Sequence, residues 1–222
     1  MNEKNITKST LPFVIGSVIC AALLALTVQT TEKPIAENMR VATEIAVKGV
    51  FPDSAKFISF AVDGKKLKAV DSETSKKAEK MYATYDATGK FSGVAIPAAG
   101  PAFKDELKIL YGYNSDKECI IGFKVLKSTE TAGYGDRISD PKETKFQESF
   151  LCLDARLNSE KMGLERNIET VASGKKTNGS QIDGIAGATV TSKGLGVIIN
   201  KSAQRIIPII YGNLSVLQNG NK

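Results

Sequence analysis

An uninterrupted apolar run near the N-terminus constrains this chain more than any other feature. Residues 11–28 carry no charged side chain, and eighteen helical residues reach roughly 27 Å, close to the thickness of the hydrocarbon layer of a bilayer. The run therefore predicts one transmembrane helix. A cleaved signal peptide is the main alternative, because Lys4 and Lys8 resemble its basic start, but no good small-residue cleavage site follows. A lipoprotein modified at Cys20 fits less well, since Ile19 is bulky where a small residue is needed.

The charges that flank this run predict its orientation. Lys4 and Lys8 lie close before it, whereas Lys33, Arg40 and Lys48 are dispersed after it. Because positive charge is retained on the cytoplasmic side, residues 1–10 are expected in the cytoplasm and the large domain on the outer face of the cytoplasmic membrane.

The composition limits which partners and which cofactor chemistry the rest of the chain can have. Its 222 residues suit one domain plus an anchor, and the net charge of +6 permits attraction to anionic lipid or to an acidic redox partner. Nucleic acid is not an expected partner, because the lysines are spread along the chain without an aromatic-basic stripe. The absence of histidine removes the usual base and zinc ligand, and three cysteines cannot hold a four-thiolate iron-sulfur cluster. Redox chemistry would need an organic cofactor or a partner's centre, with no metal site in this chain.

Two cysteines, Cys119 and Cys152, lie outside the apolar run. They can form a disulfide if this part of the chain faces an oxidising compartment, and two buried free thiols are at least as compatible with the sequence. The sequence leaves both states open.

Short apolar segments separated by turn residues predict an α+β domain. A helix-like pattern covers 37–50, and a strand at 56–62 turns at Asp63-Gly64 toward a partner at 67–70. The short spacing favours antiparallel pairing, because parallel crossovers need a dozen or more residues. The further strands expected in this sheet are 80–85, 91–97, 106–113 and 119–126.

The last third of the chain predicts fewer strands. Residues 149–153 are a weaker strand candidate, and the polar stretch 173–180 reads as a loop. Apolar residues at helical spacing cover 195–207, and Pro208 is expected to end or kink that helix. The apolar tail 209–217 then packs under the sheet or against a membrane partner.

Residues 183–192 read Asp-Gly-Ile-Ala-Gly-Ala-Thr-Val-Thr-Ser, directly before that helical pattern. Two glycines and small neighbours let the backbone approach a phosphate closely, the hydroxyls can contact it, and the start of a helix favours negative charge. The segment is a candidate anion site. Taken alone, its composition favours the plainer interpretation, a glycine-rich turn capped by Ser or Thr.

The same ten residues resemble the flavinylation motif of the FMN-binding domain in the G subunit of the Rnf complex and the C subunit of the sodium-translocating NADH:quinone reductase. In that family, the threonine that ends a Ser/Thr-Gly-Ala-Thr core carries FMN through a phosphoester bond. The resemblance assigns this role to Thr189, with Asp183, Gly187 and Ala188 in register. Ala186 stands where the family usually has Ser or Thr, so one hydroxyl is missing.

A second segment, residues 121–138, resembles the family's strand and its Glu-Thr-Pro-Gly-Leu-Gly loop, with Ala132 for Pro and Tyr134 for Leu. Alone it would pass for an ordinary turn. The two segments lie in the family's order, about fifty residues apart, and the resemblance covers roughly 90–205. Together with the apolar run, it divides the chain into a cytoplasmic N-terminus 1–10, a transmembrane helix 11–28, a membrane-proximal α+β region 29–89, an FMN-binding domain 90–205 and a tail 206–222.

The resemblance also implies roles for individual residues. Thr131 is expected to hydrogen-bond the flavin, Glu130 to order the loop or form a polar edge, and Tyr134 to lie against the ring or to be plain core. Lys193 would partly offset the phosphate charge or stay solvated. The remaining expected cofactor contacts are Gly133, Thr191 and Ser192. No catalytic residue is expected, because a separate flavin transferase attaches the cofactor.

The implied function is electron transfer through covalent FMN in an Rnf-type complex that couples ferredoxin and NAD oxidoreduction to Na⁺ or H⁺ movement. The implied partners are the other integral and peripheral subunits, the transferase and membrane lipid. No dinucleotide fingerprint occurs, because the glycines at 184–196 do not lie in a βαβ frame. The alternatives are the corresponding quinone-reductase subunit, which tends to be longer, a membrane-tethered FMN protein outside either complex, and a noncatalytic binding module.

Overall fold

The computed structural model describes residues 3–70 and 79–219, which fall into two compact units, Met1–Thr43 and Glu44–Lys222. A continuous helix, α1 (Glu3–Val50), contains the whole described part of the first unit and enters the second. The sequence predicts separate helices at 11–28 and 37–50, and the structure joins them. Within it, the hydroxyls of Thr27 and Thr31 donate to carbonyls four residues earlier, Leu23 O at 2.8 Å and Thr27 O at 2.7 Å, which satisfies these polar groups inside the helix. Among the described residues, α1 is the one helix long and apolar enough to cross a membrane.

The second unit is built on an antiparallel sheet, which confirms the predicted α+β class. The described strands follow the spatial order β2-β1-β3-β4-β5-β6-β7, so nearly every neighbour in the sheet is also a neighbour in sequence. This meander is what short turns between strands dictate. The strands are β1 (Lys56–Asp63), β2 (Lys66–Ala69), β3 (Lys80–Tyr85), β4 (Phe91–Pro101), β5 (Glu106–Asn114), β6 (Cys119–Lys127) and β7 (Leu153–Asp154).

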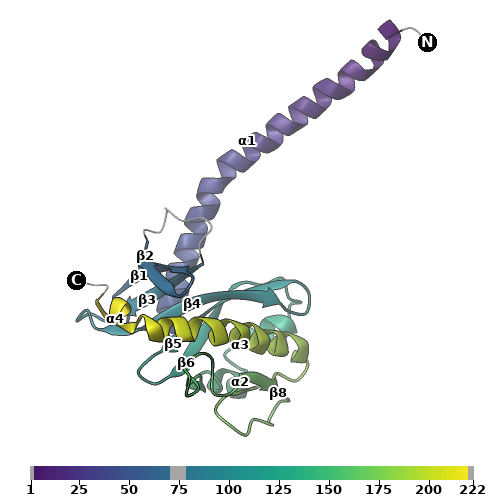
Figure 1. Cartoon of the computed structure of the whole chain (residues 1–222). Helices are drawn as coiled ribbons and strands as arrows, with labels where there is room; N and C mark the ends of the chain where they lie inside the picture. Colours follow the sequence, from purple (N-terminus) through teal and green to yellow (C-terminus); the bar gives the residue numbers. More distant parts are fainter. Residues whose placement is uncertain (1–2, 71–78, 220–222) are drawn as a thin grey trace. The chain divides into compact units, whose positions relative to one another are not determined.

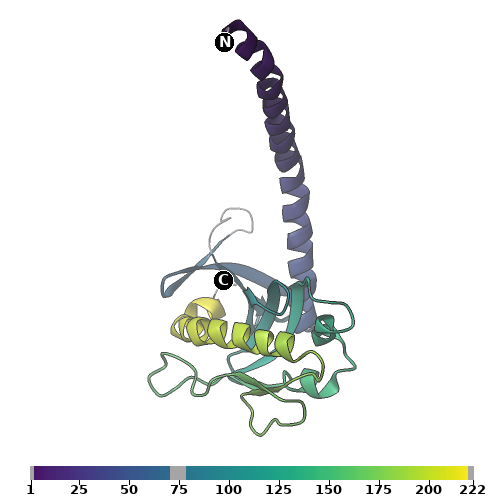
Figure 2. The same ribbon diagram turned by 90° about the vertical axis from the view of Figure 1, so that its right-hand side faces the viewer.

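A second layer covers one face of the sheet. Its main element is α3 (Thr189–Gly212), which lies beside β4 (Figure 1) and is seen from the side in Figure 2. A parallel pair, β8 (Glu169–Val171) with β9 (Gln181–Asp183), contacts α3 and leads into it. The layer is completed by the 3₁₀-helix η1 (Gly135–Ser139), α2 (Thr144–Glu148) and α4 (Leu214–Asn219).

Three details of the domain differ from the sequence-based expectation. The strand expected at 149–153 begins only at Leu153, after α2 and a turn. The pair β8–β9 was not predicted, because each strand has only three residues. Pro208 does not end α3: Ile207 and Ile210, on either side of it, are fully buried, so core packing holds both halves of the helix.

The C-terminal tail packs on the domain, the first of its two expected placements. Leu217 is fully buried, and its carbonyl accepts a hydrogen bond of 2.6 Å from the hydroxyl of the buried Tyr85. The tail therefore completes the main core.

Two apolar clusters lie on opposite faces of the sheet, because successive strand residues point to opposite sides. Val94, Ile96 and Tyr111 belong to the main core with α3, whereas the alternating Ala95 and Leu110 pack against the end of α1 through the residues Ala46, Val47, Val50 and Phe51. Close approach of α1 depends on Gly112, where a Cβ would clash with Val50. The last turn of α1 is thus part of the folded domain.

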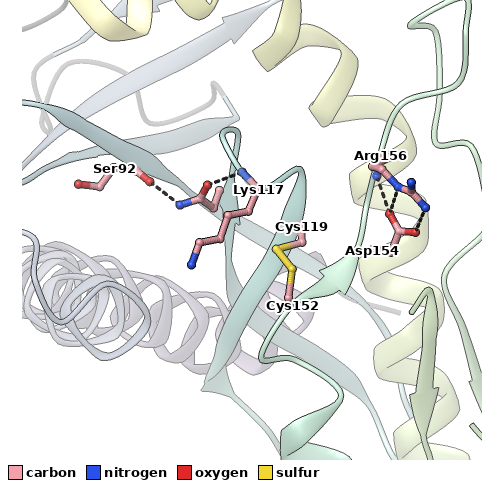
Figure 3. Close-up of a disulfide and its surroundings, with 7 residues drawn as sticks. Ser92, Lys117, Cys119, Cys152, Asp154 and Arg156 are labelled. Carbon is pink, nitrogen blue, oxygen red and sulfur yellow. Dashed lines mark hydrogen bonds and ion pairs between the residues drawn. A yellow bond between two sulfur atoms is a disulfide. The ribbon is translucent and has the colours of Figure 1, made fainter. Parts of the chain in front are cut away.

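A disulfide joins Cys119 at the start of β6 to Cys152, with the two Cα atoms 5.2 Å apart (Figure 3). The sequence leaves the state of this pair open, and the structure resolves it as bonded. Immediately after Cys152, β7 pairs with β6 as Cys119↔Asp154 and Ile120↔Leu153. The disulfide therefore secures a two-residue edge strand that has few hydrogen bonds of its own.

We expect the double substitution Cys119→Ser and Cys152→Ser to lower the free energy of unfolding by about 3 to 4 kcal/mol, because the bond closes a loop with a sequence separation of 33. Urea unfolding of the detergent-solubilised protein measures this change. Cys20→Ser is the matched control, since Cys20 is a free cysteine in α1 and its substitution should leave the unfolding curve unchanged. Equal stability of the double variant and the wild type would contradict the expectation.

Candidate functional site

A cavity of about 450 Å³ opens where the loop after β6 meets the start of α3. Its volume lies in the range of small-molecule sites. The structure brings together Thr131 and Tyr134 from one sequence segment with Thr189 and Thr191 from the other. The lining residues are Phe103, Thr131, Tyr134, Gly135, Gly187, Ala188, Thr189, Val190 and Thr191.

Thr189 is the first residue of α3, and its side chain is exposed at the cavity. The preceding residue, Ala188, occupies the N-cap position and has no side-chain group to cap the helix. The first hydrogen bond of the helix runs from Ser192 N–H to Ala188 O at 2.9 Å, so the N–H groups of the first turn have no intrahelical acceptor. An accessible hydroxyl thus lies at a helix start whose partial positive charge favours an anion.

Ser192, in the first turn of α3, fixes the shape of the turn that precedes Thr189. The Ser192 hydroxyl is fully buried, donates to Ala188 O at 2.8 Å and accepts the N–H of Ile185 at 3.2 Å. Gly187 adopts a left-handed φ of +85°, which favours glycine there. Ser192 is therefore outside the cavity lining and holds the turn in shape.

Asp183 is also placed away from the cavity lining. Its carboxylate is buried and accepts the N–H groups of Gly174 at 2.6 Å and Lys175 at 3.3 Å, while its own N–H donates to Ser149 Oγ at 3.0 Å. The motif's acidic residue thus folds the polar loop 173–180 against the end of β9.

Glu130 joins three segments around the cavity. One carboxylate oxygen accepts the Lys104 N–H from the β4–β5 turn at 2.9 Å, and the other accepts the Thr191 hydroxyl from α3 at 2.7 Å. Thr191 is buried, so its hydroxyl is already committed to this bond. Gly135 lies against Glu130, and a Cβ there would approach the Glu130 Cβ to 2.7 Å. Of the two roles expected for Glu130, these contacts provide the ordering of the loop.

The other residues of this loop either shape its turn or line the cavity. Thr131 is exposed and lines the cavity, while its carbonyl accepts the N–H groups of Tyr134 at 3.1 Å and Gly135 at 3.0 Å. Gly133 has a left-handed φ of +79° and is outside the lining, so it serves the turn. Tyr134 is 63% exposed and lines the cavity, which excludes a core role. Lys193 is exposed in the first turn of α3.

Sequence reasoning missed two apolar residues at this cavity. Phe103 is 64% exposed and Val190 is 56% exposed, and both join Tyr134 in the lining. A large aromatic residue in an otherwise polar turn was the available signal for Phe103. With these side chains beside an exposed hydroxyl and an uncapped helix start, the cavity fits a ligand that combines a flat apolar ring with a phosphate.

Comparisons with known proteins agree with this geometry. A model of the FMN-binding domain matches residues 103–204. The G subunit of the Na⁺-translocating ferredoxin:NAD⁺ oxidoreductase complex of Acetobacterium woodii is 30% identical over 212 residues, which cover 91% of this chain and 89% of that one. The G subunit of the ion-translocating oxidoreductase complex of Methanosarcina acetivorans is 28% identical over 192 residues, covering 86% of this chain and 89% of the relative.

Solved structures show the same fold. NqrC of Shewanella oneidensis aligns with a TM-score of 0.58 at 15% identity, over 76% of this chain and 88% of that one. The C subunit of the Na⁺-translocating NADH-quinone reductase of Parabacteroides distasonis aligns with a TM-score of 0.53 at 23% identity, over 73% and 79%. The fold, the matched domain and the identity along most of the chain together show that this protein belongs to the family of G subunits of ion-translocating oxidoreductase complexes and contains an FMN-binding domain.

Proposed function

We propose that this chain is the membrane-anchored electron-transfer subunit of an Rnf-type ion-translocating ferredoxin:NAD oxidoreductase complex, and that it carries FMN as a phosphoester on Thr189. One observation carries the proposal: Thr189 places an exposed hydroxyl at the uncapped start of α3, inside the cavity. The other integral and peripheral subunits of the complex would be its partners. Bound FMN supplies the redox chemistry, and the residues of this chain hold and orient it.

The attachment requires a separate flavin transferase with its own metal and FAD. Thr189 Oγ1 forms a bond to the phosphorus of the FMN half of FAD, the pyrophosphate bond to AMP breaks, and AMP leaves. The hydroxyl proton passes to a base of the transferase. This assignment of the base is supported by the cavity lining, which contains no carboxylate, imidazole or amine among the described residues.

In this proposal, different cavity residues bind different parts of FMN. The free N–H groups and the partial positive charge at the start of α3 offset the phosphate charge. Phe103, Tyr134 and Val190 provide an apolar surface for the ring, with aromatic stacking adding about 0.5 to 1.5 kcal/mol beyond burial. Thr131 offers a hydroxyl for a hydrogen bond to the polar edge of the ring.

The proposed location is the cytoplasmic membrane, with a single pass through α1, the N-terminus in the cytoplasm and the FMN domain on the outer face. The apolar part of α1 supports the anchor, and Lys4 and Lys8 support the orientation. The disulfide adds an independent argument, because such bonds persist in oxidising compartments outside the cytoplasm.

The C subunit of a Na⁺-translocating NADH:quinone reductase is the second candidate, favoured by the solved structures that share the fold. Identity along nearly the whole chain to G-subunit relatives favours the Rnf assignment. Purification of the native complex distinguishes the two by the other polypeptides that accompany this chain, and a lone FMN protein would support a tethered carrier outside either complex.

Thr189→Ala should abolish covalent flavin on coexpression with a flavin transferase, because no acceptor oxygen remains. In-gel flavin fluorescence and intact mass measure the attachment. Thr191→Ala is the matched control and should retain the flavin, since the Thr191 hydroxyl is buried and donates to Glu130. Fluorescence that survives the first substitution and disappears with the second would move the attachment site to Thr191.

Thr131→Val should leave attachment largely intact but shift the flavin reduction potential or slow electron transfer, because the ester holds the phosphate while a hydrogen bond to the ring is lost. Potentiometric titration and stopped-flow reduction measure these effects. Thr129→Val is the control, since Thr129 is exposed in the same loop and outside the cavity lining. An unchanged potential and rate in a folded, fully flavinylated Thr131 variant would show that Thr131 only shapes the turn.

Protease added to intact spheroplasts should digest the domain that follows α1, because the proposed topology exposes it outside the cytoplasmic membrane. Immunoblotting follows the digestion, and a cytoplasmic protein that stays intact controls for lysis. Full protection of the domain until the spheroplasts are lysed would show that the domain lies on the cytoplasmic side.

A further inference from the structure

Arg137 connects the two loops that form the cavity, and neither its charge nor its partners were anticipated from the sequence. Its Nη1 donates to the carbonyl of Ala186 at 2.7 Å, across a sequence separation of 49 residues. Arg137 lies on η1, two residues after the cavity residue Gly135. Ala186 lies three residues before Thr189, so the bond reaches from one wall of the cavity to the turn that carries the proposed acceptor.

The guanidinium group is fixed on its other side by Glu143. Arg137 Nε donates to Glu143 Oε1 at 2.8 Å, and Nη2 donates to the same oxygen. The two side chains are only 33% and 23% exposed, which limits screening by solvent. The 3₁₀-helix that carries Arg137 is itself anchored, because Ile138 is buried in the core and its carbonyl accepts Gln147 Nε2 at 2.9 Å. The donor to Ala186 O is therefore held in place before any ligand binds.

Arg137 also lies close to Gly187, the residue that follows Ala186 in the turn. A Cβ at Gly187 would lie 3.3 Å from Arg137 Nη1, so the guanidinium packs against the backbone two residues before Thr189. At position 186 the contact uses the backbone carbonyl, which any residue provides. The hydroxyl missing at Ala186 is thus not needed for this bond.

We propose that Arg137 is a positioning residue for the modification of Thr189. Its charged hydrogen bond holds the turn 185–188 in the conformation that presents the Thr189 hydroxyl and the first N–H groups of α3 together. Its fixed positive charge also lies beside the turn that would carry the flavin phosphate. Arg137 makes and breaks no bond itself; the transfer from FAD to Thr189, with AMP as leaving group, is the one described above. The inference rests on the proposed function.

Arg137 acts in this proposal by changing the population of turn conformations. Hydrogen bonds from charged donors are stronger than those between neutral groups, and the Ala186 carbonyl lies on an exposed turn with a left-handed glycine beside it. Ser192 holds the two ends of the turn at Ile185 and Ala188, so without the guanidinium the middle of the turn, Ala186 and Gly187, would sample other conformations. A transferase that recognises one conformation then binds more weakly in proportion to the fraction of time that this conformation is present.

The test measures the initial rate of flavin incorporation by intact mass, using the full-length chain and a flavin transferase supplied with FAD below saturation. Arg137→Ala should lower the rate about tenfold, a factor that corresponds to about 1.4 kcal/mol. Arg137→Lys should recover part of the rate, since an ammonium group can reach one acceptor but cannot reproduce the guanidinium fork. Amide hydrogen exchange of residues 185–191 in the unmodified chain should be faster in Arg137→Ala than in the wild type.

Arg156→Ala is the matched control. Arg156 also binds a carboxylate through two nitrogens, with Nε and Nη2 at 2.9 and 2.7 Å from the oxygens of Asp154 (Figure 3), but it follows β7 and is outside the cavity lining. Its substitution should leave the rate of incorporation unchanged. An equal loss of rate in Arg156→Ala would show general destabilisation and overturn the proposal.

A wild-type rate in Arg137→Ala would also overturn the proposal. If that variant does not fold, Glu143→Ala decides, because it frees the guanidinium while keeping its charge: a reduced rate supports positioning, and a wild-type rate contradicts it. Failure of the proposed function looks different. In that case the wild type takes up no flavin, or Thr189→Ala takes up as much as the wild type, and both proposals fall together.

Discussion

The packing of α3 across the sheet is the interaction on which the rest of the site depends. The apolar face of this helix, including Leu195, Ile199 and Ile206, is buried in the main core with residues of the central strands. Beneath it, the buried Tyr111 hydroxyl donates to Ser202 Oγ at 2.9 Å, and burial raises the pKa of Tyr111 far above its usual value, so the phenol stays a neutral donor. A helix held in this way has a fixed start, and Thr189 is the residue at that start.

Polar contacts then place the loops against this fixed point. Glu130 joins the β4–β5 turn and the loop after β6 to Thr191, and Arg137 joins η1 to the turn before Thr189. Both use a charged group to satisfy backbone or hydroxyl partners that would otherwise depend on water. Apolar burial thus sets where the helix lies, while charged hydrogen bonds set the shape of the loops around it. The two effects act on different parts of the site and together leave Thr189 accessible.

Much of the sheet was predictable from sequence, because each strand is an apolar segment with a clear turn at its end, such as Asp63-Gly64 before β2. Several misses share a cause: the local signal was weaker than the tertiary contact. The three-residue strands β8 and β9 are too short for periodicity to reveal, and Pro208 is tolerated because isoleucines on both sides are buried. The loop after β6 and the motif before α3 were identifiable as segments. The sequence did not show which of their side chains face the cavity, because Asp183 and Ser192 hydrogen-bond to backbone groups instead. Nor did it show that Phe103, from a different turn, lines the same cavity.

An open cavity is compatible with tight retention of a cofactor only if something other than enclosure holds it. Phe103, Tyr134 and Val190 are all more than half exposed, so the apolar lining leaves a large part of any bound ring facing solvent or a partner. A covalent bond at Thr189 removes this conflict, because a tethered ring stays at high effective concentration even when each contact to it is weak. In the proposed function, the cavity residues would then set orientation and potential, and the exposed side of the ring would be available for electron exchange with another polypeptide. On this view, the exposure of the site is a consequence of attachment through Thr189 and a condition for its proposed function.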